Sequence, residues 1–162
     1  MLKREKKMLQ VRRILVPTDF SLYSDQAVDY AIMLAKNFKA VVTVMHVTEP
    51  FPYTMTDPFI MVEHGRTLSL IAQSLLANLR KKLGAKGLTV RTHLVRGIPH
   101  HEIVKKAVQD RANMIVMGTH GRTGMEHLLL GSVAEKVVRL AGCPVLTVRS
   151  TRGTKRRDRG MS

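Results

Sequence analysis

The sequence has few cysteines and few aromatic residues, and it has no long apolar run. Among its 162 residues are one cysteine, Cys143, no tryptophan, and only 4% aromatic residues. A single cysteine excludes a disulfide or a multi-cysteine metal site within one chain. Scarce aromatic rings leave little for stacking on nucleic-acid bases. No apolar stretch approaches the roughly 20 residues that span a bilayer, so we expect no membrane association.

The N-terminal residues give no sign of a secretory signal. The first thirteen residues are mostly charged, and the apolar run Ile14-Leu15-Val16 stops at Pro17. This run is too short for the apolar core of a signal peptide. We therefore expect a cytoplasmic location, and the chain length favours a single domain.

Positive charge is concentrated at the two ends of the chain. The net charge is +15. Residues 1–13 and residues 149–162 each carry +5, so the 135 residues between them also carry only +5. We expect a basic lead-in over residues 1–11, a domain over residues 12–149, and a basic, disordered tail over residues 150–162. Nucleic-acid or anionic-surface binding through these tails is one alternative function, and it would depend steeply on salt. A solvated tail without a partner is the simpler interpretation.

Apolar patterns predict alternating strands and helices. Short apolar or β-branched runs predict strands at 12–17, 40–47, 88–95, 114–117 and 144–148, and helical periods or turn residues predict helices between them. This alternation predicts an α/β fold: a single-domain, open five-stranded parallel sheet with helices on both faces. With the first strand at the switch point beside the fourth, the strand order is 3-2-1-4-5. Residues 49–61 contain three prolines and no period, which predicts a long loop that could act as a lid.

A glycine-rich stretch follows the fourth predicted strand. Its spacing, from Gly118, is Gly-x2-Gly-x9-Gly-Ser, with a further glycine at 124. Glycine allows close approach of the backbone, and a helix start attracts anions, so the stretch predicts a phosphate site. It matches neither the P-loop nor the dinucleotide fingerprint. The alternative is an ordinary capping box formed by Ser132 and Glu135, which leaves the glycines unexplained.

Several separate motifs resemble the universal stress protein family. They are Pro17-Thr18-Asp19-Phe20-Ser21, His46-Val47, Gly97-Ile98-Pro99, the run from Gly118 to Glu135, and Cys143-Pro144-Val145. The resemblance covers roughly residues 12–149, and the glycine spacing is that of the ATP-binding branch. It implies an adenine nucleotide alpha hydrolase-like fold in a cytoplasmic ATP-binding protein that acts as a regulator in stress responses. It also implies a homodimer formed through the last strand, 145–148, and a protein partner that is unknown.

The resemblance also implies a set of nucleotide-binding residues. Pro17, Thr18 and Asp19 would line the adenine and ribose end, and the backbone of Val47 would meet the adenine. Residues of the glycine-rich stretch would surround the ribose and phosphates: Met117, Gly118, His120, Gly121, Arg122, Thr123, Gly124, Gly131, Ser132, Val133 and Ala134. A bound Mg²⁺ or Mn²⁺ would be held mainly by phosphate oxygens and waters, as Mg²⁺ often is.

No catalytic constellation is evident in the sequence. Ser132 lacks the context of a nucleophile elbow, so we expect at most slow ATP hydrolysis. An adenylyl-transferring enzyme remains an alternative. Asp19 could instead be a plain helix N-cap. His100 and His101 invite a metal hypothesis, but adjacent helical residues do not face the same way, which favours solvated positions.

Overall fold

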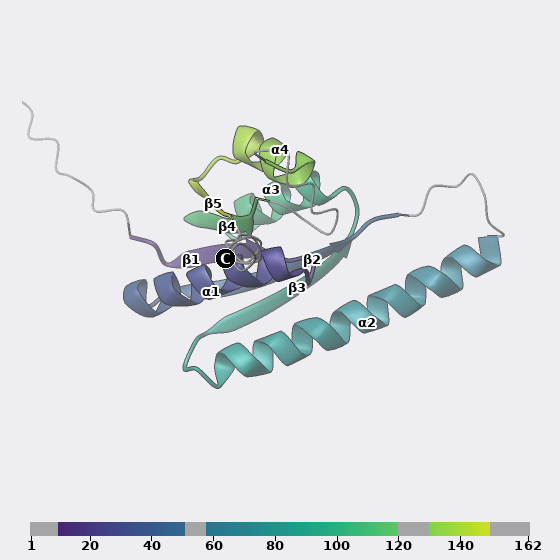
Figure 1. Cartoon of the computed structure of the whole chain (residues 1–162), viewed down its shortest axis with the longest axis horizontal. Helices are drawn as coiled ribbons and strands as arrows, with labels where there is room; N and C mark the ends of the chain where they lie inside the picture. The colour runs from purple at the N-terminus through teal and green to yellow at the C-terminus, as the bar shows by residue number, and fades with distance from the viewer. Residues whose placement is uncertain (1–9, 51–57, 120–129, 150–162) are drawn as a thin grey trace, which may run out of the picture.

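The computed structural model describes residues 10–50, 58–119 and 130–149, and these form one parallel five-stranded sheet between two layers of helices (Figure 1). The strand order is β3-β2-β1-β4-β5, which confirms the predicted order. The elements are β1 (Arg13–Pro17), α1 (Leu22–Phe38), β2 (Val41–Thr48), α2 (Pro58–Gly84), β3 (Val90–Arg96), α3 (Pro99–Gln109), β4 (Met114–Gly118), α4 (Ser132–Leu140) and β5 (Val145–Val148).

Alternation along the central strand separates two apolar cores. Ile14 and Val16 of β1 pack in the core beneath α1 and α2, whereas Leu15 packs in the core beneath α3 and α4. All three side chains are at most 1% exposed. A strand buried on both faces needs apolar residues at every position, which explains the continuous apolar run.

Strand pairing brings distant turns to one end of the sheet. Pro17 at the end of β1 is in register with Met45 of β2, and the Thr18 N–H donates to the Met45 carbonyl oxygen at 2.8 Å. On the other side, β4 lies beside β1 and ends at Gly118. The chain segments that follow β1 and β4 therefore start from the same end of the sheet, where the winding direction changes.

The helix α2 differs from the sequence prediction. It begins at Pro58, so the predicted loop 49–61 is wrong over its last residues, and residues 51–57 lie outside the described part of the chain. Proline suits the first helical turn, which explains this start. The N-terminal half of α2 projects past the sheet (Figure 1), so little of it is buried and its periodic signal is weak. No helix in the three described stretches is long and apolar enough to cross a membrane.

Candidate functional site

A pocket of about 590 Å³ opens at the carboxyl ends of β1, β2 and β4. The ten predicted site residues within the described stretches all line it: Pro17, Thr18, Asp19, Val47, Met117, Gly118, Gly131, Ser132, Val133 and Ala134. The other five, His120, Gly121, Arg122, Thr123 and Gly124, lie outside the described residues. The fold thus gathers residues from four separate parts of the sequence around one cavity.

The turn after β1 is held by hydroxyl and carboxylate hydrogen bonds. Ser21 is the N-cap of α1, since its hydroxyl oxygen accepts from the Ser24 N–H at 3.2 Å. Asp19 is therefore not the N-cap. Its carboxylate instead accepts from the Ser21 hydroxyl at 2.6 Å and from the Ser21 N–H at 3.1 Å. Thr18 contacts the Ser24 hydroxyl at 3.0 Å, which ties the turn to the helix start.

These bonds favour an ionised carboxylate at the pocket wall. Burial raises the pKa of Asp19, but hydrogen bonds from the Ser21 hydroxyl and backbone outweigh it, so this pKa lies below the ordinary 3.8. A fixed negative charge therefore lies beside the end of β1. Such a carboxylate can accept hydrogen bonds from hydroxyl groups of a ligand.

Phe20 and His46 form a tightly constrained pair beside Asp19. Phe20 has a left-handed backbone with φ of 61°, and its N–H donates to the Thr18 hydroxyl oxygen at 3.0 Å. Its ring centroid lies 4.6 Å from that of His46. The buried His46 places Nδ1 2.7 Å from the Thr18 carbonyl oxygen, and because a carbonyl only accepts, Nδ1 carries the hydrogen. The left-handed backbone of Phe20 is strained, and such strain persists only where surrounding contacts hold it, as at ligand sites.

The start of α4 presents backbone donors to the pocket. Gly131 is the N-cap and has no side-chain cap hydrogen bond, so the alternative interpretation, a capping box formed by Ser132 and Glu135, is wrong. Ser132 is one position too late to cap the helix. The first three N–H groups of a helix have no acceptor within it. In α4 these belong to Ser132, Val133 and Ala134, all of which line the pocket.

Two backbone hydrogen bonds hold the residues that flank the glycine-rich segment. The Gly131 N–H donates to the Thr119 carbonyl oxygen at 2.7 Å, and the Thr119 N–H donates to the Val148 carbonyl oxygen at 3.0 Å. These two bonds link the end of β4, the end of β5 and the start of α4. Thr119 and Gly131, which flank this segment, both line the pocket.

Sequence reasoning missed an apolar wall contributed by α2. Four residues spaced as one helical stripe line the pocket: Leu68, Ile71, Ala72 and Leu75. Ile71 is 51% exposed and Leu75 is 40% exposed, although both are large and apolar. Apolar residues at helical spacing predict a helix here, but such a stripe alone does not distinguish a core face from a ligand face. These residues lie near the middle of α2, and only the fold shows that this part of the stripe faces the pocket.

The charges along the pocket are few and acidic. Among its described lining residues, Asp19 and Glu49 are acidic and none is Lys or Arg. The part of the chain that the structure describes contains no group of three His, Cys, Asp or Glu side chains suited to a metal ion. An anionic ligand would thus meet backbone N–H groups here, rather than cationic side chains, within the described lining.

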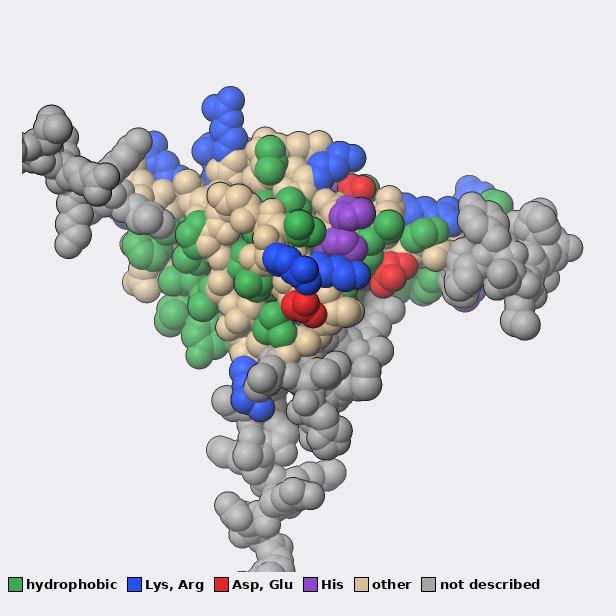
Figure 2. Space-filling model, turned by 90° about the horizontal axis from the view of Figure 1, so that it is seen from above, with side chains coloured by type: hydrophobic (Ala, Val, Ile, Leu, Met, Phe, Trp, Pro, Cys, Tyr) green, Lys and Arg blue, Asp and Glu red, His purple; other side chains and the backbone are tan. Residues whose placement is uncertain are grey.

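The histidine pair of α3 lies close together, against expectation. The ring centroids of His100 and His101 are 4.2 Å apart, and two neighbouring histidine side chains are visible on the face covered by α3 and α4 (Figure 2). Slight burial and the neighbouring His101 and Lys136 lower the pKa of His100. Helical spacing separates side-chain directions but does not prevent two rings in a first turn from touching. Neither histidine lines the pocket.

The fold and the pocket define an open α/β protein with a cavity at its topological switch point, where ligands bind in such folds. The chain belongs to the universal stress protein family, whose model matches residues 10–149. Universal stress protein MJ0531 of Methanocaldococcus jannaschii is 37% identical over 145 residues, which cover 85% of this chain and 82% of that protein.

Solved structures agree with this assignment. The structure of hypothetical protein MJ0577, from the same organism, is 33% identical with a TM-score of 0.81, and the match covers 87% of this chain and 97% of that one. A universal stress protein from Archaeoglobus fulgidus, solved in complex with dAMP, is 22% identical with a TM-score of 0.60 over 86% of this chain and 98% of that one. At that identity, the second match shows the shared fold.

Proposed function

We propose that the pocket binds an adenine nucleotide, with ATP as the preferred ligand. The observation that carries this proposal is the pairing of an apolar wall with a helix start that has no side-chain cap hydrogen bond, across one cavity. A planar base needs apolar contact, and phosphates need N–H donors. The dAMP complex of the Archaeoglobus fulgidus protein is consistent with an adenine nucleotide in this fold.

The base and ribose lie between β2 and α2 in this proposal. Val47 meets the base with its backbone, while Ile71 and Leu75 cover the other face of the ring. Pro17, Thr18 and the ionised Asp19 line the adenine and ribose end, where the carboxylate can accept from ribose hydroxyl groups. The volume of about 590 Å³ lies within the ordinary range for small-molecule sites.

The phosphates lie at the start of α4. Backbone N–H groups of Ser132, Val133 and Ala134 donate to phosphate oxygens, and the positive end of the helix dipole adds to the attraction. The glycine-rich residues Gly118, Gly121 and Gly124 allow the chain to approach the ligand, and Arg122 supplies a cation. Mg²⁺ or Mn²⁺ is held mainly by phosphate oxygens and waters, because the described pocket lining offers only two carboxylates, Asp19 and Glu49.

The test is direct titration of nucleotide. Calorimetry with ATP in the presence of Mg²⁺ is expected to give one site per chain, with weaker binding of GTP. Denaturing the purified protein and separating the released small molecules is expected to yield adenine nucleotide. No heat of binding at millimolar ATP, together with no released nucleotide, would rule the proposal out.

We further propose that nucleotide binding serves regulation in a cytoplasmic stress response. The printed hydrogen bonds of Thr18, Asp19 and Ser24 hold the turn after β1 and the start of α1, which supports a binding role with at most slow hydrolysis. Product analysis after incubation with ATP separates this role from adenylyl transfer. Formation of AMP and pyrophosphate would favour the transferase, whereas unchanged ATP, or slow formation of ADP, supports the regulator.

A homodimer through β5 completes the proposal. β5 lies at one edge of the sheet, and the carbonyl oxygens of Pro144 and Val148 accept from β4. By the period of two along a strand, Val145 and Thr147 turn their backbone groups to the open edge. Thr147→Pro removes an outward N–H and is expected to shift the dimer toward monomer in sedimentation. An unchanged dimer would place the interface elsewhere.

A further inference from the structure

Exposed arginine and lysine side chains gather at the end of the sheet opposite the pocket. At this end the strands β1 and β3 begin and the helices α1 and α2 end, as the left side of Figure 1 shows. We call this surface the amino-end face. Its exposed cations are Arg12, Arg13, Lys36, Lys39, Lys81, Lys82, Lys86 and Arg111.

Hydrogen bonds from backbone and side-chain groups join the loops that carry these cations. The Val41 N–H, which follows the α1–β2 loop, donates to the Arg12 carbonyl oxygen at 2.9 Å. The Arg13 Nε–H donates to the Arg111 carbonyl oxygen at 2.9 Å, which links β1 to the α3–β4 loop. The Asn113 side chain accepts from the N–H groups of Arg12 and Arg13, both at 2.9 Å. The cations are thus displayed from a rigid framework.

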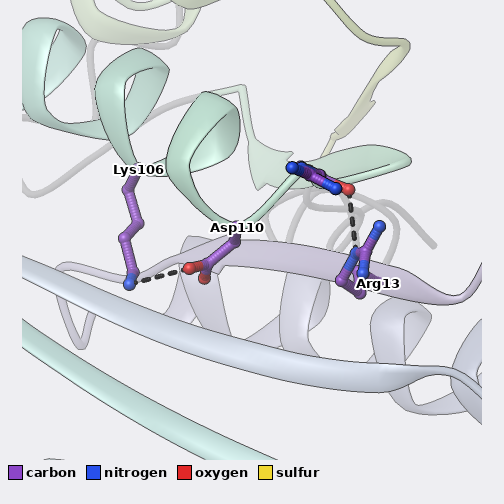
Figure 3. A network of polar contacts seen from close by, with 4 residues as sticks. Arg13, Lys106 and Asp110 are labelled. Atoms are coloured by element: carbon purple, nitrogen blue, oxygen red, sulfur yellow. Dashed lines mark hydrogen bonds and ion pairs between the residues drawn. The ribbon is translucent and has the colours of Figure 1, made fainter.

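The acidic side chain of this face in the described residues is already paired. Asp110 Oδ1 lies 2.9 Å from Lys106 Nζ, and both side chains are largely buried (Figure 3). Figure 3 also shows Arg13 close to this turn, where its side chain donates to the chain that follows Asp110. Because Asp110 is neutralised by Lys106, the positive potential of the surrounding cations is left uncompensated.

Helix electrostatics accounts for only part of this set. Lys36, Lys81 and Lys82 lie in the last turns of their helices, where a cation offsets the negative end of the dipole. Arg12, Lys39, Lys86 and Arg111 lie outside those turns. The sequence before β1 adds Lys3, Arg4, Lys6 and Lys7 against Glu5, and it joins the domain at this face.

We infer that the amino-end face docks the phosphate backbone of nucleic acid without reading its sequence. Lysine and arginine contacts to phosphates supply such binding, and scarce aromatic residues fit the absence of base recognition. An anionic membrane is a poorer fit. Helices that bind in a membrane surface lie along it with an apolar face buried, whereas α1 and α2 meet this face with their ends.

The test measures binding of the full chain to a short fluorescent DNA duplex at several salt concentrations. The logarithm of the affinity is expected to fall linearly with the logarithm of salt, with a slope of about −0.9 per neutralised phosphate. The double variant Lys36→Glu with Lys86→Glu is expected to lose at least about tenfold in affinity and to flatten the slope by about 1 per contact removed.

A matched control carries the same change in charge at the other end of the molecule. Arg66→Glu with Lys136→Glu replaces two exposed cations that lie outside both the pocket lining and the amino-end face. It is expected to lose less than about threefold in duplex affinity from the change in net charge. Both variants must melt as the parent does, which shows that any lost affinity is not lost folding.

Three outcomes would overturn the inference. The first is equal loss of duplex binding in the two double variants, since net charge alone would then explain it. The second is full retention in the Lys36→Glu and Lys86→Glu protein with loss when Arg156 and Arg157 are replaced by Glu, which would assign binding to the C-terminal segment. The third is tighter binding to phosphatidylserine vesicles than to duplex at equal salt.

Discussion

The two ends of the sheet are proposed to bind anions by different means. At the pocket end, helix starts point N–H groups at the cavity, and the charged side chains in the described lining are the acids Asp19 and Glu49. At the amino-end face, helix ends expose carbonyl groups, and lysine and arginine side chains surround them. Because every helix runs antiparallel to the strands, helix polarity assigns backbone donors to one end and cationic side chains to the other. The pocket therefore suits one small ligand held in fixed geometry, whereas the opposite face suits a polyanion held by charge.

A negative charge at the start of α4 should weaken ATP binding without lowering the stability of the fold. Ser132→Asp is expected to weaken ATP binding by about 10–100-fold, because the carboxylate repels phosphate and competes for its N–H donors. The same carboxylate favours the helix start, so the melting temperature should stay equal or rise slightly. Calorimetry and thermal melts measure the two effects.

The matched control for that variant is Ser132→Ala. It removes the hydroxyl without adding charge, so its ATP affinity should change by less than about fivefold from the loss of one neutral hydrogen bond. If Ser132→Asp bound ATP as well as the parent, the phosphates would not lie at the start of α4.

The apolar wall of α2 gives the second largest expected effect. Ile71→Asn is expected to weaken ATP binding about tenfold, because a polar side chain replaces apolar contact with the base. Leu70→Asn is the control: Leu70 is 59% exposed on the same helix but does not line the pocket. Its ATP affinity should match the parent. Equal losses in the two variants would place the base away from α2.

The hydroxyl of Ser21 should affect stability in a pH-dependent way. Ser21→Ala removes the N-cap of α1 and a donor to Asp19, and it is expected to cost about 1 kcal/mol of unfolding free energy at neutral pH. The folded pKa of Asp19 lies below its ordinary 3.8, so its contribution is present above that value and is lost as pH falls through the folded pKa.

The difference between parent and Ser21→Ala should therefore shrink in acid. Denaturant unfolding at neutral pH and at several values below 3.8 measures it. Thr67→Ala, at an exposed hydroxyl of α2 that donates to the Glu63 carbonyl, should change stability little at any pH. A constant deficit for Ser21→Ala across this range would show that capping alone, without Asp19, accounts for the loss.

The sequence predicted the sheet well because local patterns encode it. The continuous apolar run at β1 reflects burial on both faces, and the predicted strand order, with β3 at one edge, is confirmed. The glycine spacing and the turn at Thr18 and Asp19 were far apart in sequence, yet parallel topology alone brings them to one end.

What the sequence could not predict depends on contacts between distant segments. The wall formed by Ile71 and Leu75 depends on how α2 packs against β2 and β3, which no local pattern encodes. The position of the α4 cap, at Gly131 rather than Ser132, was a shift of one residue that capping patterns do not resolve. The amino-end face could not be predicted either, because its cations come from four segments that are far apart in the sequence.

Hydrogen–deuterium exchange with each ligand tests the division between the two ends most directly. ATP with Mg²⁺ is expected to slow exchange at the backbone N–H groups of 132–134 and to leave segments 10–13, 36–41 and 81–90 unchanged. DNA duplex at low salt is expected to protect those three segments and to leave 132–134 unchanged. Protection of the amino-end face by ATP, or no protection at the start of α4, would contradict the account.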